Sequence, residues 1–292
     1  MNYFKSIFRY LRARVLSVGI SRNCTLTLND DELQASRMVS VIVAVHDGYE
    51  VTRRCLKCLE LFGGHAEVIV VDDGSKLPQV RKMLDETCAR NSWRLLRHES
   101  ARGHSRACES GVAASTKPIF CLLNSDALVT HCSWHGVVSA FAESDKIAVV
   151  GPSTSETPTG QCVRRAFYCR RHWSDIQICS FAEKYVGSHK AEPPIELGVI
   201  GGFAFFMRRE IWDNFGGFDK NLSDYGNETE LCKRMNRMGY QAMWTKSGYI
   251  HHLGNESYGK SLGLAAIRKR CLQADDYIRN LHTSQQKQAD KF

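Results

Sequence analysis

Short apolar runs alternate with helical segments along the first half of this chain, and this alternation restricts its fold more than any other feature. The runs cover residues 40–45, 67–71, 93–96 and 118–123, and helical spacing of apolar residues fills 52–61, 79–91 and 105–115. Strands in which apolar and polar residues do not alternate are buried on both faces. The pattern therefore predicts an α/β domain in which helices flank a mostly parallel, Rossmann-like central sheet.

Polar clusters follow three of the predicted strands at the points where the strands end. They are His46-Asp47, Asp72-Asp73 and Asn124-Ser125-Asp126. In open parallel sheets, ligands bind beyond the carboxyl ends of the strands. A carboxylate there can accept hydrogen bonds from a nucleotide, which suits Asp73, or hold a divalent cation at a diphosphate, which suits Asp126. Each cluster taken alone is also a common turn sequence.

The second half of the chain is less regular. An apolar run at 147–151 predicts a fifth strand. The sequence of 152–197 does not predict helices or strands. Further elements are predicted as a strand at 201–207, a helix at 209–215 and a helix at 227–238. The last helix ends at Gly239 and has Glu228 and Glu230 in its first turn, where carboxylates also complement the helix dipole.

The basic residues lie mainly at the edges of the chain. The formal net charge is +8, and basic residues gather in 1–20, in 164–171 and from 260 onward, so the rest is mildly acidic. The first 20 residues predict a basic amphipathic helix, which either lies on a membrane or docks on a protein surface. Residues 21–37 are polar and are predicted as a linker. The basic residues avoid the strand ends, which argues against a nucleic-acid partner.

The 12 cysteines are scattered in a chain too long to need disulfides, which predicts reduced thiols in the cytoplasm. The single Cys-x-x-Cys, Cys55 to Cys58, has no second pair, so a packed helix face is favoured over a zinc site. No apolar run approaches the roughly 20 residues of a membrane-spanning helix, and no clear export signal is present. We therefore expect a cytoplasmic protein, held at the inner face of the membrane if its basic ends bind lipid.

A set of short motifs recurs in order between about residues 38 and 258. They are SVIVAVHD (40–47), VIVVDDGS (68–75), RGHSRACESG (102–111), FCLLNSD (120–126), GGFAFFMRRE (201–210), GGFD (216–219), ETELCKR (228–234) and HHLGNES (251–257). Each motif is weak alone, but the ordered set resembles the inverting glycosyltransferase family 2 with the GT-A fold. The resemblance is to rhamnosyltransferase-like members and others of polysaccharide biosynthesis.

The resemblance implies a transferase that moves a hexosyl or deoxyhexosyl group from a nucleotide-diphosphate sugar, with Mn²⁺ or Mg²⁺, to a glycan or polyprenyl-linked acceptor. It implies that residues 38–126 form the nucleotide-binding half and 127–258 the acceptor half, followed by a helical tail at 259–292. An oligomer is left open. The implied contacts to the donor come from Val45, Asp72, Asp73, Gly103, Asn124 and Asp126.

The resemblance also assigns the metal and the base. It gives Asp126 the cation, and of the two adjacent histidines we favour His252 over His251 as its companion. Glu228 takes the role of general base with Glu230 in support, because an inverting displacement needs a base beside the acceptor hydroxyl. The alternative for both glutamates is that they only stabilise the helix terminus.

Three departures from the family pattern favour a second reading, a non-catalytic binding subunit with a degenerate site. Asn124 replaces the usual first Asp of the acidic motif, and Asp47 and Ala101 replace the usual Asn residues. Retention of Asp73, Asp126 and Glu228 speaks against this reading. A nicotinamide-dependent Rossmann enzyme is excluded because the turn after the first strand has no Gly-x-Gly-x-x-Gly.

Overall fold

The computed structural model describes residues 27–163, 173–222, 224–254 and 264–289. The predicted amphipathic helix in the first 20 residues and the basic cluster at 164–171 lie outside the described residues. Within them, ten cysteines are free, and Cys55 and Cys58 are buried on one helix. No described helix has the length and hydropathy needed to cross a bilayer.

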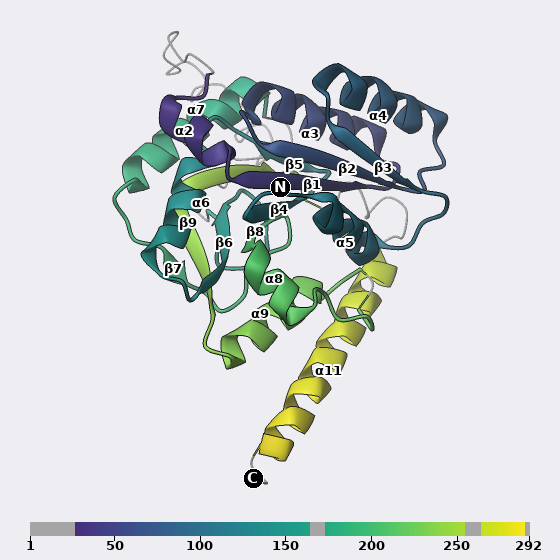
Figure 1. Cartoon of the computed structure of the whole chain (residues 1–292), viewed down its shortest axis with the longest axis vertical. Coiled ribbons are helices and arrows are strands. Elements are labelled where there is room, and N and C mark those ends of the chain that lie inside the picture. Colours follow the sequence, from purple (N-terminus) through teal and green to yellow (C-terminus); the bar gives the residue numbers. More distant parts are fainter. Residues whose placement is uncertain (1–26, 164–172, 223, 255–263, 290–292) are drawn as a thin grey trace, which may run out of the picture.

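One twisted sheet runs through the described part of the chain (Figure 1). Its strand order is β3-β2-β1-β4-β8-β6-β9-β5, and β7 pairs with β9. The strands are β1 (Val39–Val45), β2 (Glu67–Asp73), β3 (Arg94–His98), β4 (Ile119–Asn124), β5 (Ala127–Val129), β6 (Ile147–Ser153), β7 (Ile195–Glu196), β8 (Ala204–Arg208) and β9 (Gln241–His252). The first four strands are mutually parallel, whereas β8 is antiparallel to both β4 and β6.

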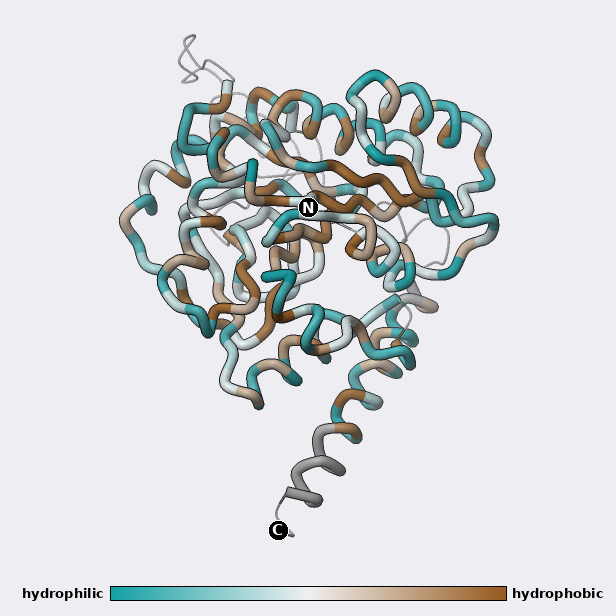
Figure 2. The backbone as a smooth tube through the Cα atoms, viewed as in Figure 1, coloured by the Kyte–Doolittle hydropathy of each residue, from teal (hydrophilic) through white to brown (hydrophobic). Residues whose placement is uncertain are grey.

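Helices cover both faces of the sheet, as the unbroken apolar strands predicted. The described helices are α2 (Asp30–Ser36), α3 (Tyr49–Phe62), α4 (Pro78–Asn91), α5 (His104–Ala114), α6 (His135–Ala140), α7 (Asp175–His189), α8 (Arg209–Phe215), α9 (Asn227–Arg237) and α11 (Leu264–Ala289). Val41, Val43 and Val45 of β1 pack with α3, α4, α6 and α7, whereas Ile42 and Ala44 pack with α5, α8 and α9. Figure 2 shows the central strands as the most hydrophobic part of the chain. The predicted α/β fold is confirmed.

The prediction of a linker over residues 21–37 is wrong for residues 30–36, which form α2. The side chain of Asn29 caps this helix by accepting a hydrogen bond from the Glu32 N–H at 2.9 Å. Glu32 is buried and accepts the backbone N–H groups of Trp134 and His135 at the start of α6. The acidic residues of this segment made it look like a solvated linker, but one of them caps a distant helix.

The region that the sequence left unassigned contains α7, which packs against β9 and carries a capping box formed by Ser174 and Gln177. Arg54 of α3 holds the start of α7 through Asp175 at 2.7 Å. Arg54 lies 121 positions before Asp175 in the chain, so the sequence around α7 did not show what holds the start of this helix.

Candidate active site

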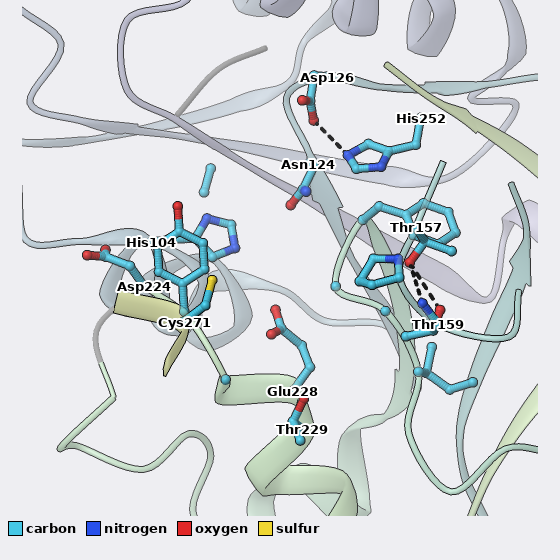
Figure 3. Close-up of a pocket in the computed structure, with 18 of the residues that line it drawn as sticks. His104, Asn124, Asp126, Thr157, Thr159, Asp224, Glu228, Thr229, His252 and Cys271 are labelled. Carbon is cyan, nitrogen blue, oxygen red and sulfur yellow. Dashed lines mark hydrogen bonds and ion pairs between the residues drawn. The ribbon is translucent and has the colours of Figure 1, made fainter. Parts of the chain in front are cut away.

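A cavity of about 360 Å³ lies at the carboxyl ends of β1 and β4. Its walls come from the ends of these strands, from residues 157–159 and 199–203, from the start of α9, from the end of β9 and from α11. Its lining includes Ala44, His46, His104, Asn124, Asp126, Thr157, Thr159, Gly202, Asp224, Glu228, His252 and Cys271. Figure 3 shows these side chains converging from different elements on one space. The cavity has the position expected for a ligand site in such a sheet.

Asp126 and His252 form a carboxylate–imidazole pair in this cavity. The Nε2 atom of His252 lies 3.3 Å from Oδ1 of Asp126, and both side chains are largely buried (Figure 3). The Nδ1–H group of His252 donates to the carbonyl of Glu156 at 2.7 Å, which turns Nε2 toward Asp126. Burial lowers the pKa of His252, but the interaction with the nearby Asp126 carboxylate outweighs it, so the pKa is raised overall.

The chemistry of this pair fits a divalent cation. The buried Nε2 atom makes no hydrogen bond of acceptable geometry within the described part of the chain. Metal-bound histidines usually donate their other ring N–H to a carbonyl or carboxylate, as His252 does to Glu156. The described residues contain no group of three or more His, Cys, Asp or Glu side chains that could hold a metal ion. The remaining ligands of a bound cation would therefore be diphosphate oxygens and water.

His251, the neighbour of His252, points into the core. It is buried, and its Nδ1 atom lies 2.9 Å from the hydroxyl of Tyr249. Burial lowers the pKa of His251 to about 3, so this ring is neutral at physiological pH. The alternation of side chains along β9 thus places only the second histidine in the cavity.

Glu228 lies in the first turn of α9 and points into the cavity (Figure 3). Its carboxylate approaches the backbone of Gly202 closely, since a Cβ atom on Gly202 would lie 2.4 Å from Oε1 of Glu228. Glycine at position 202 therefore makes the room that Glu228 occupies. This contact joins two segments that are 26 residues apart in the chain, and the sequence did not reveal it.

Glu230 does not line the cavity. It is buried, and its two carboxylate oxygens accept from Nε and Nη2 of Arg234 at 3.0 and 2.9 Å. Arg234 also donates to the carbonyls of Phe215 and Gly217. Glu230 therefore ties α9 to the loop after α8, and the structure does not bring it together with Glu228 in the site.

Asp73, for which the resemblance implies a contact with the nucleotide base, holds a loop. Its Oδ1 and Oδ2 atoms accept the backbone N–H groups of Arg102 and Gly103, each at 2.9 Å. Nδ1 of His98 lies 2.6 Å from Oδ1. These contacts orient the Asp73 carboxylate toward the loop at residues 102–103.

Asp72 is also engaged by the protein, because Oδ1 accepts the Ser75 N–H and Oδ2 accepts from Nε of Arg97. Val45 and Gly103 do not line the cavity either. The side chain of Val45 points to the other face of the sheet, and Gly103 is the residue before α5, with a φ of 94°. Their neighbours Ala44, His46 and His104 supply the lining instead.

Asp47, one of the departures from the family pattern, has a structural task. Its Oδ1 atom accepts the backbone N–H groups of Lys76 and Leu77 at 2.9 and 3.0 Å. Its φ is 55°, a left-handed conformation that Asp and Asn tolerate better than other side chains. The carboxylate thus joins the loop after β1 to the loop after β2.

A threonine pair forms a wall of the cavity that sequence reasoning missed. The Thr159 hydroxyl donates to Oε1 of Gln161 at 2.8 Å, and Oγ1 of Thr157 lies 3.0 Å from Oγ1 of Thr159. Gln161 is fully buried and donates to the carbonyl of Pro152. These residues lie in the segment whose organisation was not legible, and the only local signal was the cluster of threonines.

This arrangement, an α/β sheet with a carboxylate–histidine pair and an opposing glutamate at its carboxyl edge, defines a GT-A fold with a candidate glycosyl-transfer site. The chain belongs to glycosyl transferase family 2, whose family model matches residues 40–215. Glu228, His252 and α11 lie beyond this match.

Curated relatives carry related names. The chain is 23% identical over 287 residues to inactive polypeptide N-acetylgalactosaminyltransferase-like protein 5 of Macaca fascicularis, covering 91% of this chain and 62% of that protein. It is 27% identical over 177 residues to polypeptide N-acetylgalactosaminyltransferase 10 of Rattus norvegicus, covering 56% of this chain and 28% of that protein. The chain thus spans less than two thirds of the length of these relatives.

Solved structures share the fold at low sequence identity. The structure of GalNAc-T7 with UDP, GalNAc and Mn²⁺ matches with a TM-score of 0.57 and 16% identity, covering 74% of this chain and 43% of that chain. The mannosyltransferase PcManGT from Pyrobaculum calidifontis, in complex with GDP-Man and Mn²⁺, matches with a TM-score of 0.56 and 16% identity, covering 90% and 67%. At this identity the likeness establishes the fold.

Proposed function

We propose that the protein is an inverting glycosyltransferase that moves a sugar from a nucleotide-diphosphate sugar to a hydroxyl of a glycan or lipid-linked acceptor. The observation that carries this proposal is the placement of Glu228 in the same cavity as Asp126 and His252. A base and a cation-binding pair that line one space suit a single in-line displacement.

In the proposed reaction, Asp126 and His252 would hold a divalent cation on the donor side of the cavity. When bound, the cation offsets the negative charge that develops on the leaving nucleoside diphosphate. Glu228 accepts the proton of the acceptor hydroxyl while the oxygen of that hydroxyl forms a bond to the anomeric carbon. The bond from that carbon to the diphosphate oxygen breaks at the same time, so the configuration is inverted.

Asn124 lines the cavity at the end of β4 and fits the donor side of this scheme. As an amide it brings no charge to the cation, so Asp126 supplies the carboxylate of this short motif. The resemblance also gives donor contacts to Asp72, Asp73, Val45 and Gly103. In the proposed complex, these four residues shape the loops around the nucleotide rather than line the cavity.

The test is a panel of UDP- and GDP-sugars, each incubated with the purified protein and Mn²⁺ or with EDTA. Release of nucleoside diphosphate reports the donor, and the anomeric configuration of the product, followed by NMR, reports the stereochemistry. We expect turnover of one donor class that depends on the cation, and inversion at the anomeric carbon. Retention of configuration would contradict the single displacement.

A non-catalytic GT-A binding subunit is the second candidate. Asn124 at the acidic motif favours it, and one relative is named inactive. This candidate predicts binding of a nucleoside diphosphate without release from any donor in the panel. The carboxylate of Glu228, which points into the cavity, is the feature that this candidate leaves without a role.

The charge pattern of the chain supports a proposal for its location and its acceptor. We propose that basic residues in 1–20 and 260–292 bring the protein to an anionic surface at the cytoplasmic face of a membrane, where a polyprenyl-linked acceptor would lie. Pelleting with anionic and neutral liposomes, with the full chain compared with residues 21–292, tests this. Equal pelleting of both forms would remove the contribution of the N-terminal segment.

A further inference from the structure

The C-terminal helix α11 packs on the segment that leads into the candidate base. This segment, Asp219–Gly226, ends two residues before Glu228, and its residue 223 is outside the described part. Leu222 forms a small apolar cluster with Ala274 and Ile278 of α11, flanked by Tyr225 and Tyr277. Figure 1 shows α11 extending beyond the rest of the domain, and the middle of the helix, from Ala274 to Ile278, makes these contacts.

A close approach to α11 occurs at Gly226, the residue before α9. A Cβ atom on Gly226 would lie 2.9 Å from Cδ1 of Ile278 and 3.0 Å from Cβ of Ala274. Gly226 also has a φ of 81°, which side chains rarely adopt. The start of the helix that carries Glu228 therefore abuts α11 with no room for a side chain between them.

Two polar contacts fix the same segment. The hydroxyl of Tyr277 donates to Oδ2 of Asp219 at 2.9 Å and accepts from Nδ2 of Asn221 at 2.9 Å. Arg270 donates from Nη1 to Oδ2 of Asp224 at 2.8 Å. Asp224 itself lines the cavity, so this ion pair connects α11 directly to the wall of the site.

Cys271, the residue after Arg270, also lines the cavity. Helix α11 is therefore part of the wall of the site and at the same time the support of the segment before Glu228. We infer that α11 is a positioning element for the proposed transfer, with Arg270 and Tyr277 as the positioning residues that hold Glu228 in place against the acceptor. This inference rests on the proposed function.

The expected loss of rate follows from how far Glu228 would be displaced. A displacement of a reacting group by about 1 Å can lower a rate about 100-fold, because proximity and orientation supply much of the catalysis. Loosening the segment should therefore lower kcat, while donor binding at Asp126 and His252 on the far side of the cavity stays intact. A purely structural helix would instead lower stability and leave the remaining folded enzyme with normal kinetics.

The variants are Arg270→Met and Tyr277→Phe in the full chain, with Arg268→Met as the matched control. Arg268 lies on the same helix and is exposed. We expect each test variant to lower kcat about tenfold or more with an unchanged KM for the donor, and Arg270→Lys to restore most of the loss. The control should match the wild type within about twofold.

Two readouts do not depend on glycosyl transfer. Hydrogen exchange of the peptide that covers residues 224–231 should become faster in both test variants. Alkylation of Cys271, quantified by peptide mapping, should become faster as well, and should be slowed in the wild type by UDP or GDP with Mn²⁺.

Unchanged hydrogen exchange and unchanged alkylation in both variants would overturn the positioning role. A loss of kcat in Arg270→Lys as large as that in Arg270→Met would overturn it as well. If the wild type transfers no sugar but the variants loosen residues 224–231, the proposed function fails while the docking of α11 stands. If Arg270→Met does not fold, Tyr277→Phe, which removes a single hydroxyl, decides the outcome.

Discussion

Gly202 and Glu228 fit together so closely that a methyl group on the glycine would lie 2.4 Å from Oε1 of the glutamate. The φ of Gly202 is not in the left-handed region, so the constraint at this position is space rather than backbone conformation. The atom that such a methyl group would meet, Oε1 of Glu228, is at the end of a flexible side chain. A substitution here should therefore move the carboxylate of Glu228 and leave the fold intact.

Gly202→Ala should lower kcat roughly 10- to 100-fold with little loss of stability, because the carboxylate must leave its position beside the acceptor. Steady-state kinetics and thermal unfolding measure the two effects. The matched control is Gly187→Ala, since Gly187 lies in α7 and its Cβ would meet nothing within 4 Å. Normal turnover by Gly202→Ala would show that the position of Glu228 in this contact does not matter for transfer.

Asp126→Asn should abolish the dependence of nucleoside diphosphate binding on Mn²⁺. The amide keeps the shape of the side chain but removes the charge that a divalent cation needs beside His252. Calorimetry with UDP and with GDP, each with Mn²⁺ or EDTA, measures this. Asp85→Asn is the control, because Asp85 forms a surface ion pair with Arg97. If Asp126→Asn binds the nucleoside diphosphates with the same Mn²⁺-dependent affinity as the wild type, Asp126 is not a ligand of the cation.

Glu32→Gln should stabilise the protein above neutral pH. Burial raises the pKa of Glu32 from 4.5 to about 7, so the folded state disfavours the carboxylate. The wild type therefore loses stability as the pH rises from about 4.5 to 7, by on the order of 1–3 kcal/mol. Glutamine cannot ionise and can still accept the N–H groups of Trp134 and His135.

The difference in unfolding free energy between Glu32→Gln and wild type should therefore be small near pH 5 and grow in favour of the variant by pH 8. Urea unfolding at several pH values measures it. A difference that stays constant from pH 5 to 8 would show that Glu32 does not titrate in this range.

Strands β1 to β4, β6 and β8 were predictable because unbroken apolar runs reflect burial on both faces, which is a local signal. Helix α2 and helix α7 were not, because what holds them is distant: Glu32 binds the start of α6, and Asp175 binds Arg54. The same distinction applies to long strand β9, whose partners β5 and β6 lie about 100 residues earlier.

The site residues also differ in how well the sequence predicted their place. Asn124, Asp126, Glu228 and His252 follow strand ends or open a helix, and all four line the cavity. In the sequence, Asp73 and Glu230 have the same kind of position as these four residues. In the structure, Asp73 binds the backbone of the loop at Arg102 and Gly103, and Glu230 binds Arg234. Residue type and local spacing cannot tell a carboxylate that faces a ligand from one that is satisfied by the protein.

Glu228→Gln is the decisive substitution for the proposed mechanism. The amide preserves volume but cannot accept the acceptor's proton, so we expect a loss in kcat of roughly 10²- to 10⁴-fold with donor affinity retained. Glu230→Gln is the matched contrast, because Glu230 lies two residues after Glu228 in the first turn of α9. It weakens the pair with Arg234 and should lower the Tm while the folded fraction keeps its turnover. If Glu228 only complemented the helix dipole, its substitution would change stability by about 0.3–1 kcal/mol and leave transfer within about threefold of wild type. That result would assign the proton to another group.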